Sequence, residues 1–241
     1  MRKGEITENL VRVRERIVTS CRSCGRDPDE VTLLAVSKTR PAADLRLAFA
    51  AGQRHFGENY LQEALDKQKQ LRDLAIQWHF IGPLQSNKTR AAAEAFGWIH
   101  SVDRLKIAQR LSSQRPPQMP PLNLCLQVNI DGEASKSGLA PNGVLPLARA
   151  LAGLPNLRLR GLMAIPALKP GREAQRESLQ RLARLLHELD EALPDQPLDT
   201  LSMGMSGDME AAIEAGATIV RIGTDIFGPR PAAPGKRMEE H

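Results

Sequence analysis

The stretch Leu33–Pro41, with the sequence LLAVSKTRP, decides the fold of this 241-residue chain. Its four consecutive apolar residues predict a strand that is buried on both faces, as strands of a parallel sheet are. Pro41 opens an alanine-rich helical run over residues 42–51. The stretch therefore predicts a strand, a short loop and a helix.

Lys38 stands in this loop, which is where proteins built from such units carry their chemistry. Burial favours the neutral amine, so a lysine at the margin of a dry core becomes a nucleophile toward carbonyls. A single lysine at a strand end is more often a surface residue with its stem over the strand. The interpretation of Lys38 thus depends on what other strand ends supply.

The strand–loop–helix unit recurs along the whole chain. Strands are predicted at residues 31–37, 52–59, 76–81, 98–102, 122–130, 157–165, 200–205 and 218–222. Helices are predicted at residues 41–51, 60–73, 87–96, 103–112, 142–152, 172–192 and 208–215, and the expected N-caps are Ser86 or Asn87, Asp103 and Asp208. This count favours a single-domain TIM (β/α)8 barrel, which typically takes about 250 residues. A doubly wound open sheet is the alternative, although no G-x-G-x-x-G follows a strand.

The barrel is expected to span about 31–228 and leaves little chain outside it. Apolar residues at three- and four-residue spacing predict an amphipathic helix within residues 1–27. The tail at 229–241, rich in Pro, Lys and Glu, is expected to be loose. We therefore expect one domain over residues 1–241.

Composition narrows the class of protein. A hydrophobic fraction of 41% and a charged fraction of 25% are ordinary for a globular chain. No apolar run approaches the roughly 18 residues of a membrane span, so we expect no membrane association. Three cysteines do not form a disulfide scaffold, and we expect a cytoplasmic protein. Cys21 and Cys24 form a C-x-x-C pair that lacks the context of a redox or zinc site.

The formal net charge of +5 raises the question of nucleic-acid binding. The basic residues are scattered among acidic ones, and aromatic residues make up only 3% of the chain. A bound anionic small molecule explains the basic excess equally well. We therefore expect a small-molecule ligand and no nucleic acid.

The loops after the seventh and eighth predicted strands indicate a phosphate site. TIM barrels often bind phosphate with these two loops. They are here Met203–Gly207 and Ile222–Thr224, and each offers glycine backbone and a hydroxyl donor. Either loop alone is a weak signal, but the pair predicts an anion site.

Arg221 lies inside the eighth predicted strand, where a charge must either find a partner or face a site. An outward Arg221 paired with a helix carboxylate and an Arg221 facing a site are equally compatible with the sequence. His79 is as compatible with a satisfied core histidine as with a ligand. The five histidines show no metal-ligand spacing.

A lysine at one strand end, a phosphate site opposite and an arginine between them favour a phosphorylated aldehyde held as a Schiff base. Pyridoxal 5'-phosphate fits this description. A class I aldolase would also combine a Schiff-base lysine with a phosphate site. Its lysine would more naturally lie on a later strand, and it needs a further acid–base set.

Five motifs of this chain resemble the pyridoxal phosphate homeostasis protein family, which is related to the barrel domain of bacterial alanine racemase. They are AVSK (35–38), FGENY (56–60), WHFIGPLQSNK (78–88), LSMGMSGD (201–208) and VRIGT (220–224). The resemblance covers about residues 31–230 in order, and the W-H-F-I-G-P-L-Q string is its most specific part.

The resemblance implies pyridoxal 5'-phosphate as cofactor and a set of binding residues. These are Lys38, Asn59, Met163, Ser206, Arg221, Gly223 and Thr224. Lys38 would carry the Schiff base, and Arg221 would face the pyridine nitrogen. Ser206, Gly223 and Thr224 would hold the phosphate. Asn59 and Met163 would line the ring.

The resemblance also implies a protein that handles and buffers the cofactor rather than an enzyme. An arginine at the pyridine nitrogen disfavours its protonation and weakens the ring as an electron sink. We therefore expect a monomeric carrier in vitamin B6 homeostasis, with pyridoxal-phosphate-dependent apoenzymes as its partners. The alternative is a small racemase-like enzyme that works with the barrel alone.

Overall fold

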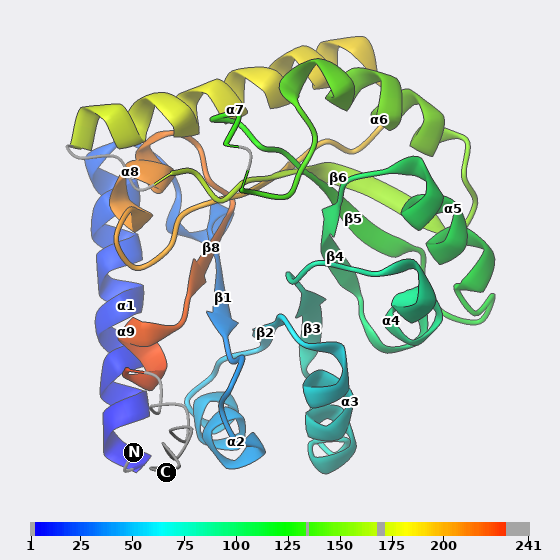
Figure 1. Ribbon diagram of the computed structural model, residues 1–241. Coiled ribbons are helices and arrows are strands. Elements are labelled where there is room, and N and C mark those ends of the chain that lie inside the picture. The colour runs from blue at the N-terminus through cyan, green and yellow to red at the C-terminus, as the bar shows by residue number, and fades with distance from the viewer. Residues whose placement is uncertain (1–2, 134, 168–171, 230–241) are drawn as a thin grey trace, which may run out of the picture.

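Eight parallel strands close into a barrel in the computed structural model, which describes residues 3–133, 135–167 and 172–229 (Figure 1). The strands are β1 (Thr32–Val36), β2 (His55–Glu58), β3 (Gln77–Phe80), β4 (Trp98–Val102), β5 (Leu122–Gln127), β6 (Leu157–Met163), β7 (Thr200–Ser202) and β8 (Ile219–Ile222). Each strand pairs with the next, and β8 pairs with β1, which places Leu34 opposite Arg221. The predicted TIM barrel is confirmed. The alternative, an open sheet, is excluded because β1 and β8 of this protein are paired with each other.

Helices surround the barrel and alternate with its strands. They are α1 (Lys3–Ser23), α2 (Ala42–Ala50), α3 (Leu61–Gln70), α4 (Thr89–Ala95), α5 (Leu105–Gln114), α6 (Val144–Ala152), α7 (Arg172–Ala192), α8 (Met209–Glu214) and α9 (Thr224–Phe227). Short 3₁₀ turns at Pro28–Glu30, Ser86–Lys88 and Pro141–Gly143 join some of them. The predicted alternation is thus confirmed, and α9 is an additional short helix that the sequence did not predict.

The expected N-caps are wrong, because none of the predicted side chains caps its helix with a hydrogen bond. Helix α4 begins at Thr89, after a 3₁₀ turn, and α5 begins at Leu105, and neither receives a side-chain cap. Asp208 does precede α8, but its carboxylate accepts a hydrogen bond of 2.6 Å from the Met205 backbone N–H instead. The Asp208 side chain therefore shapes the loop after β7 rather than the helix.

Helix α1 lies outside the barrel along α8 and α9 (Figure 1). Its buried apolar residues have the spacing that the sequence predicts, and they are Ile6, Leu10, Val13 and Ile17. A partly exposed residue of the same helix, Arg16, forms ion pairs with Glu210 of α8 at 2.8 Å and with Asp225 of α9 at 2.6 Å. This helix therefore supports the elements that follow the two expected phosphate loops.

Two predictions about the chain's organisation stay open. The tail expected at 229–241 lies, from residue 230 on, outside the described residues. The single-domain organisation remains a prediction.

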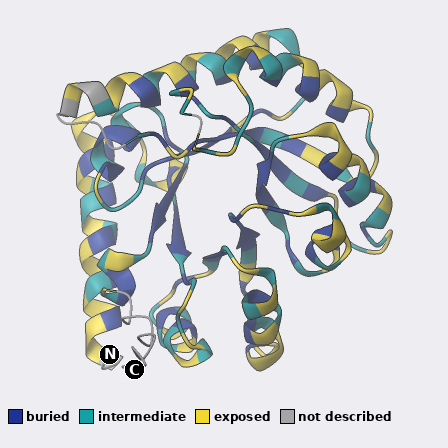
Figure 2. Ribbon diagram, viewed as in Figure 1, coloured by how far each residue is buried: buried dark blue, intermediate teal, exposed yellow. Residues whose placement is uncertain are grey.

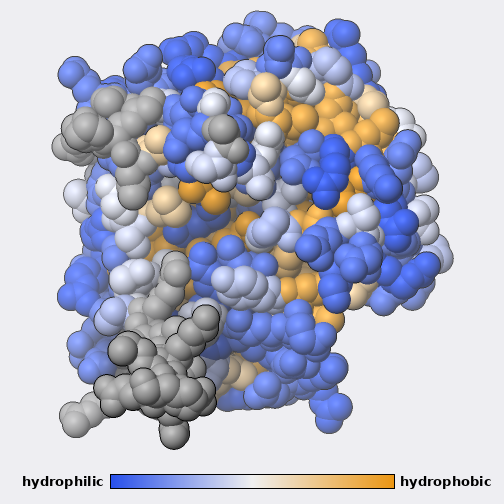
Figure 3. Space-filling model, viewed as in Figure 1, coloured by the Kyte–Doolittle hydropathy of each residue, from blue (hydrophilic) through white to orange (hydrophobic). Residues whose placement is uncertain are grey.

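The core is built mainly from aliphatic residues, as the low aromatic content requires, and it also contains Phe56, Phe80, Phe96 and Phe227. The strands are almost wholly buried, and exposed residues gather on the outer sides of the helices (Figure 2). The face drawn in Figure 3 is mostly hydrophilic, with apolar residues reaching the surface in its middle. No described helix has the length and apolar character to cross a membrane. Cys125 lies in the core, where burial raises the pKa of its thiol to about 12.

Strand alternation decides which side chains reach the barrel interior. Successive residues of a strand point to opposite faces, so Val36 and Lys38 share the inner face while Ser37 faces the helices. Gly161 of β6 permits close strand packing, because a Cβ there would overlap the Thr200 carbonyl of β7. Lys38 therefore lies on the inner side of the barrel with Arg221, and Ser37 lies on the outer side with Glu58 and Lys67.

Candidate functional site

A pocket of about 230 Å³ opens at the carboxyl ends of the strands. Its lining comes from six strand ends and comprises Val36, Lys38, Arg40, Asn59, Ile81, Ile165, Met205, Ser206, Gly207, Arg221, Gly223 and Thr224. Chain segments almost 190 residues apart thus meet in one cavity. This is the end of a TIM barrel where functional sites lie.

Six of the seven residues expected in the site line this pocket, and they are Lys38, Asn59, Ser206, Arg221, Gly223 and Thr224. The seventh, Met163, is the last residue of β6 and is buried, and it is not among the lining residues. Ile165, two residues further along, takes the lining position on that side. The structure therefore brings the two expected phosphate loops and Lys38 together.

The loops after β7 and β8 are shaped by glycines. Gly204 has a φ of +93°, and a Cβ there would lie 2.6 Å from the Ala212 Cβ. At Gly223, a Cβ would lie 3.2 Å from the Val36 carbonyl oxygen of β1. Gly204 thus lets the loop after β7 pack against α8, and Gly223 lets the loop after β8 pack against β1. The residues that follow Gly204, and Gly223 itself, line the pocket, where backbone N–H groups can serve an anion.

Arg221 faces the barrel interior, which settles the choice that the sequence leaves open. It is buried and donates hydrogen bonds to the Ser202 carbonyl at 2.5 Å, the Ser202 hydroxyl at 2.9 Å and the Ala164 carbonyl at 2.8 Å. Burial lowers the pKa of its guanidinium to about 10. The protein thus holds a cation in the pocket with neutral acceptors.

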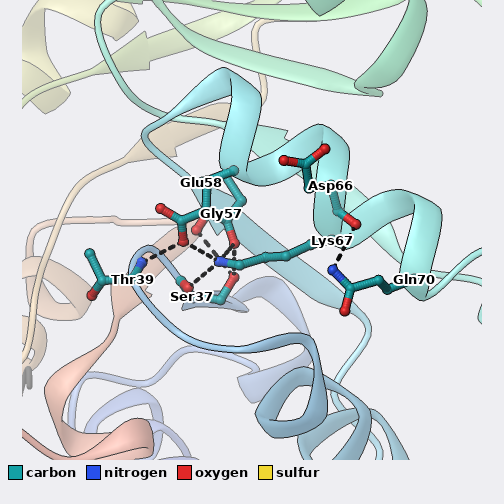
Figure 4. A network of polar contacts seen from close by, with 8 residues as sticks. Ser37, Thr39, Gly57, Glu58, Asp66, Lys67 and Gln70 are labelled. Carbon is teal, nitrogen blue, oxygen red and sulfur yellow. Dashed lines mark hydrogen bonds and ion pairs between the residues drawn. The ribbon is translucent and has the colours of Figure 1, made fainter.

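A network of charges outside the barrel fixes the backbone next to Lys38 (Figure 4). Lys67 of α3 is buried and donates to the Ser37 carbonyl at 2.7 Å. It also forms ion pairs with Glu58 at 2.7 Å and Glu63 at 2.5 Å. The Ser37 hydroxyl donates to the same Glu58 oxygen at 2.6 Å. Lys67 therefore ties β1, β2 and α3 together beneath the Lys38 loop.

The other side of Lys38 is held by the same network. Thr39 has a φ of +63°, a left-handed conformation that is unfavourable for a β-branched residue. Its backbone N–H donates to the Glu63 carboxylate at 2.6 Å. Because Glu63 also binds Lys67, the residues before and after Lys38 are clamped by one ion-pair network.

Asn59 lines the pocket, and its side chain has an unused hydrogen-bond acceptor. Its Oδ1 atom is buried and makes no hydrogen bond within the described part of the chain. Gly82, after β3, allows the Asn59 backbone to sit where it does, because a Cβ at Gly82 would overlap the Asn59 carbonyl. A buried acceptor without a partner points to a donor that a bound molecule would supply.

Below the pocket, three histidines form a continuous file that sequence reasoning missed. His55 Nδ1 lies 3.0 Å from His79 Nε2, and His79 Nδ1 lies 2.9 Å from His100 Nε2. His100 Nδ1 lies 2.8 Å from the hydroxyl of Ser202, which also accepts from Arg221. The signal that could have revealed the file is that one histidine lies on each of three consecutive strands, β2, β3 and β4. Among the described residues, no cluster could hold a metal ion.

Comparison with known proteins shows which family this chain resembles. The family described as "Alanine racemase, N-terminal domain" matches residues 6–231. The pyridoxal phosphate homeostasis protein of Pseudomonas aeruginosa is 63% identical over 225 residues, which cover 93% of this chain and 96% of that protein. The homeostasis protein of Escherichia coli K12 is 53% identical over 230 residues, which cover 94% and 97%.

Solved structures agree with this comparison. PipY of Synechococcus elongatus, solved with PLP bound, has a TM-score of 0.82 and 40% identity, covering 92% of this chain and all of that one. Alanine racemase of Clostridium difficile has a TM-score of 0.76 at 13% identity, covering 97% of this chain and 58% of that one. The second likeness is one of fold alone.

We call the network of Lys67, Glu58 and Glu63 the Lys67 clamp. It predicts that removing Lys67 lowers the stability of the protein far more than removing the cation of an exposed ion pair. Lys67→Met leaves the buried Glu58 and the adjacent Glu63 without their cation, so we expect a loss of about 3–5 kcal/mol in the free energy of unfolding. Arg46→Met is the matched control and should leave the free energy of unfolding nearly unchanged, because Arg46 pairs with Asp73 in an exposed position. Urea unfolding measures both, and equal losses would contradict the clamp.

The histidine file predicts acid sensitivity. Burial lowers the pKa of His55 and His79, and burial together with Arg221 lowers that of His100 to about 3. The unfolded chain takes up these protons near pH 6.5 while the folded chain stays neutral. The stability that these histidines contribute is therefore present above pH 6.5 and is lost as the pH falls below it, by about 2 kcal/mol at pH 5 for each of the fully buried His79 and His100.

Unfolding measurements between pH 7 and 5 check this slope, because few carboxylates titrate there. His100→Gln should make the slope shallower, and His187→Gln, at an exposed position on α7, should leave it unchanged. A slope that does not respond to His100→Gln would show that the file does not cause it.

Proposed function

The chain belongs to the pyridoxal phosphate homeostasis protein family, and on this premise we propose that it binds pyridoxal 5'-phosphate as a lysine Schiff base and serves vitamin B6 homeostasis. The observation that carries the proposal is the convergence of Lys38, Arg221 and the loops after β7 and β8 on one pocket. An amine, a cation and a glycine-rich anion site are the groups that a phosphorylated pyridine aldehyde requires.

The residues present fit this cofactor. Gly223 lets the loop after β8 lie close to Val36 of β1, and Gly223, Ser206 and Thr224 line the pocket, where their backbone and hydroxyl groups can donate to a phosphate. The unpartnered Asn59 Oδ1 offers an acceptor beside the ring. The apolar lining residues Val36, Ile81 and Ile165 suit the faces of an aromatic ring.

Each protein group has a defined task toward the cofactor. Pyridoxal phosphate, when bound, supplies an aldehyde for covalent attachment and a ring that can accept electrons. Lys38 provides the amine for attachment, and the network of Lys67 fixes the backbone from which that amine projects. Arg221 can donate hydrogen bonds but not accept them, so it holds a facing ring nitrogen unprotonated. The ring is thereby a poor electron sink.

We propose that the protein carries the cofactor without robust catalysis of its own. The titratable residues that line the described pocket are Lys38, Arg40 and Arg221, and all three are cationic types. A racemase needs a second acid–base group on the opposite face of the substrate from its lysine. Apart from these cations, the polar groups of the lining are backbone, amide and hydroxyl groups.

The alternative function is a small racemase-like enzyme of the same fold. The observation in its favour is the likeness in fold to alanine racemase, with a TM-score of 0.76. Lys38 is available as one base in both functions, so the choice rests on turnover.

We further propose that the protein is a cytoplasmic monomer that serves pyridoxal-phosphate-dependent apoenzymes, binding neither membrane nor nucleic acid. The open end of the pocket, with the exposed Tyr60 beside Asn59, leaves the cofactor within reach of an acceptor protein. Sedimentation of the purified chain would test the monomer, and transfer to an added apoenzyme would test the partner class.

The cofactor proposal predicts a yellow protein. Pyridoxal phosphate should give an absorbance band that borohydride removes while fixing the cofactor onto the Lys38 peptide. Lys38→Ala should abolish the band and the fixation, because no other lining residue is an amine. Lys69→Ala, at an exposed position on α3, is the control and should retain both. A wild-type protein that stays colourless with excess cofactor would contradict the proposal.

The carrier proposal predicts little exchange of the amino-acid α-proton. The loaded protein is incubated with alanine and other amino acids in deuterated water, and deuterium uptake is followed by mass spectrometry. Exchange should be no faster than with free pyridoxal phosphate. Rapid exchange that Lys38→Ala abolishes would favour the racemase-like enzyme.

A further inference from the structure

The histidine file connects the two ends of the barrel. His55 lines a cavity of about 410 Å³ between α1 and the amino ends of the strands, together with Thr32 and Arg54. From there the hydrogen bonds run inward through His79 and His100 to Ser202. Ser202 in turn binds Arg221, which lines the pocket at the carboxyl ends. The file is therefore a continuous path from one cavity to the other.

Arg221 fixes the direction of every hydrogen bond in this path. A guanidinium only donates, so the Ser202 hydroxyl accepts from it at 2.9 Å. The Ser202 proton needs an acceptor, and within the described residues the remaining partner of this hydroxyl is His100 Nδ1 at 2.8 Å. His100 then carries its proton on Nε2 and donates to His79 Nδ1. By the same rule, His79 donates from Nε2 to His55 Nδ1.

The opposite direction leaves a defect next to the buried cation. His100 would then donate from Nδ1 to Ser202, which already accepts from Arg221. The Ser202 proton would have no acceptor, and leaving a buried donor without a partner is destabilising. Burial keeps all three rings neutral, since it lowers the pKa of each. Neutral rings carry one proton each, so one direction satisfies every atom of the file.

We propose that His79, His100 and Ser202 are positioning residues for Arg221, and that they form a relay polarised with its acceptor nitrogens toward the cation. This inference rests on the proposed function for its consequence in cofactor binding, but not for the polarity itself. Aligned hydrogen bonds strengthen one another, so each ring increases the negative charge on the Ser202 oxygen. That oxygen, with the carbonyls of Ser202 and Ala164, takes the place of a carboxylate partner.

The surroundings keep the relay rigid. Trp98 stacks on His79 with ring centroids 5.4 Å apart and an interplanar angle of 12°. Arg160 in turn lies over the Trp98 ring at 4.9 Å. The relay thus orients a guanidinium that has more N–H donors than the barrel uses, with the remainder available to a ligand in the pocket.

The polarity is tested on the full chain without any ligand. Ring-¹⁵N-labelled histidine and two-bond ¹⁵N–¹H correlation spectra at pH 7 report the tautomer of each ring, with His79→Gln and His100→Gln for assignment. We expect both rings as neutral Nε2–H tautomers. A proton on Nδ1 of His100, a tautomer mixture in the wild type or a charged ring would overturn the proposal.

The link to Arg221 is tested at Ser202. Ser202→Ala removes the junction and should release His100 into a tautomer mixture, with about tenfold weaker binding of pyridoxal phosphate. Ser202→Thr keeps the hydroxyl and should restore both the tautomer and the affinity. Added pyridoxal phosphate should shift the His100 ring resonances in the wild type but not in Ser202→Ala. An unchanged His100 tautomer in folded Ser202→Ala would overturn the relay.

The outcomes separate this inference from the proposed function. If the wild type binds no pyridoxal phosphate, the function fails while the tautomers still decide the polarity. If the wild type binds it and His100 carries its proton on Nδ1, the relay alone fails.

Discussion

Pairing of β8 with β1 is the constraint on which the rest of this structure depends. The register sets Leu34 opposite Arg221 and Ala35 opposite Ile222, so the strand before Lys38 runs beside the strand before Gly223. Arg40, just after Lys38, reinforces the closure by donating to the Gly228 and Pro229 carbonyls. The amine after the first strand and the anion site after the last strand thus share one pocket. In an open sheet these two strands would lie at opposite edges, and the pocket would not form.

Two buried cations near the pocket are stabilised in different ways, and the difference matches their tasks. Lys67 of α3 points toward the sheet, where Glu58 and Glu63 neutralise it and the Ser37 carbonyl accepts its remaining hydrogen bond. Arg221 sits inside the barrel, where its hydrogen-bond partners are two carbonyls and a hydroxyl. A neutralised cation serves as a fixed part of the framework. A cation held by dipoles keeps its charge for an anionic ligand.

The fold could be predicted because its signal is periodic. Leu33, Leu34 and Ala35 are buried as the apolar run predicts, while Val36 at its end is half-buried and lines the pocket. The alternation of such runs with helices allows few topologies. The pocket could be predicted where motifs mark it, as for Lys38 and the glycines of the last two loops. The clamp could not, because Glu58, Glu63 and Lys67 read as ordinary charges at helix and strand positions. Their partnership depends on how α3 packs on β1, and a single sequence does not encode that distance.

The histidine file escaped prediction for a similar reason, and it changes how the site is understood. His55, His79 and His100 lie 21–24 residues apart, and no local pattern relates them. Only the parallel register, with Gly57 opposite His79 and His79 opposite Trp98, brings them to consecutive inner positions. Neutral imidazoles accept a hydrogen bond on one side and donate on the other, so they can carry polarity without carrying charge. A carboxylate in their place would have neutralised Arg221, and a pocket that binds an anionic cofactor would have lost part of its attraction for it.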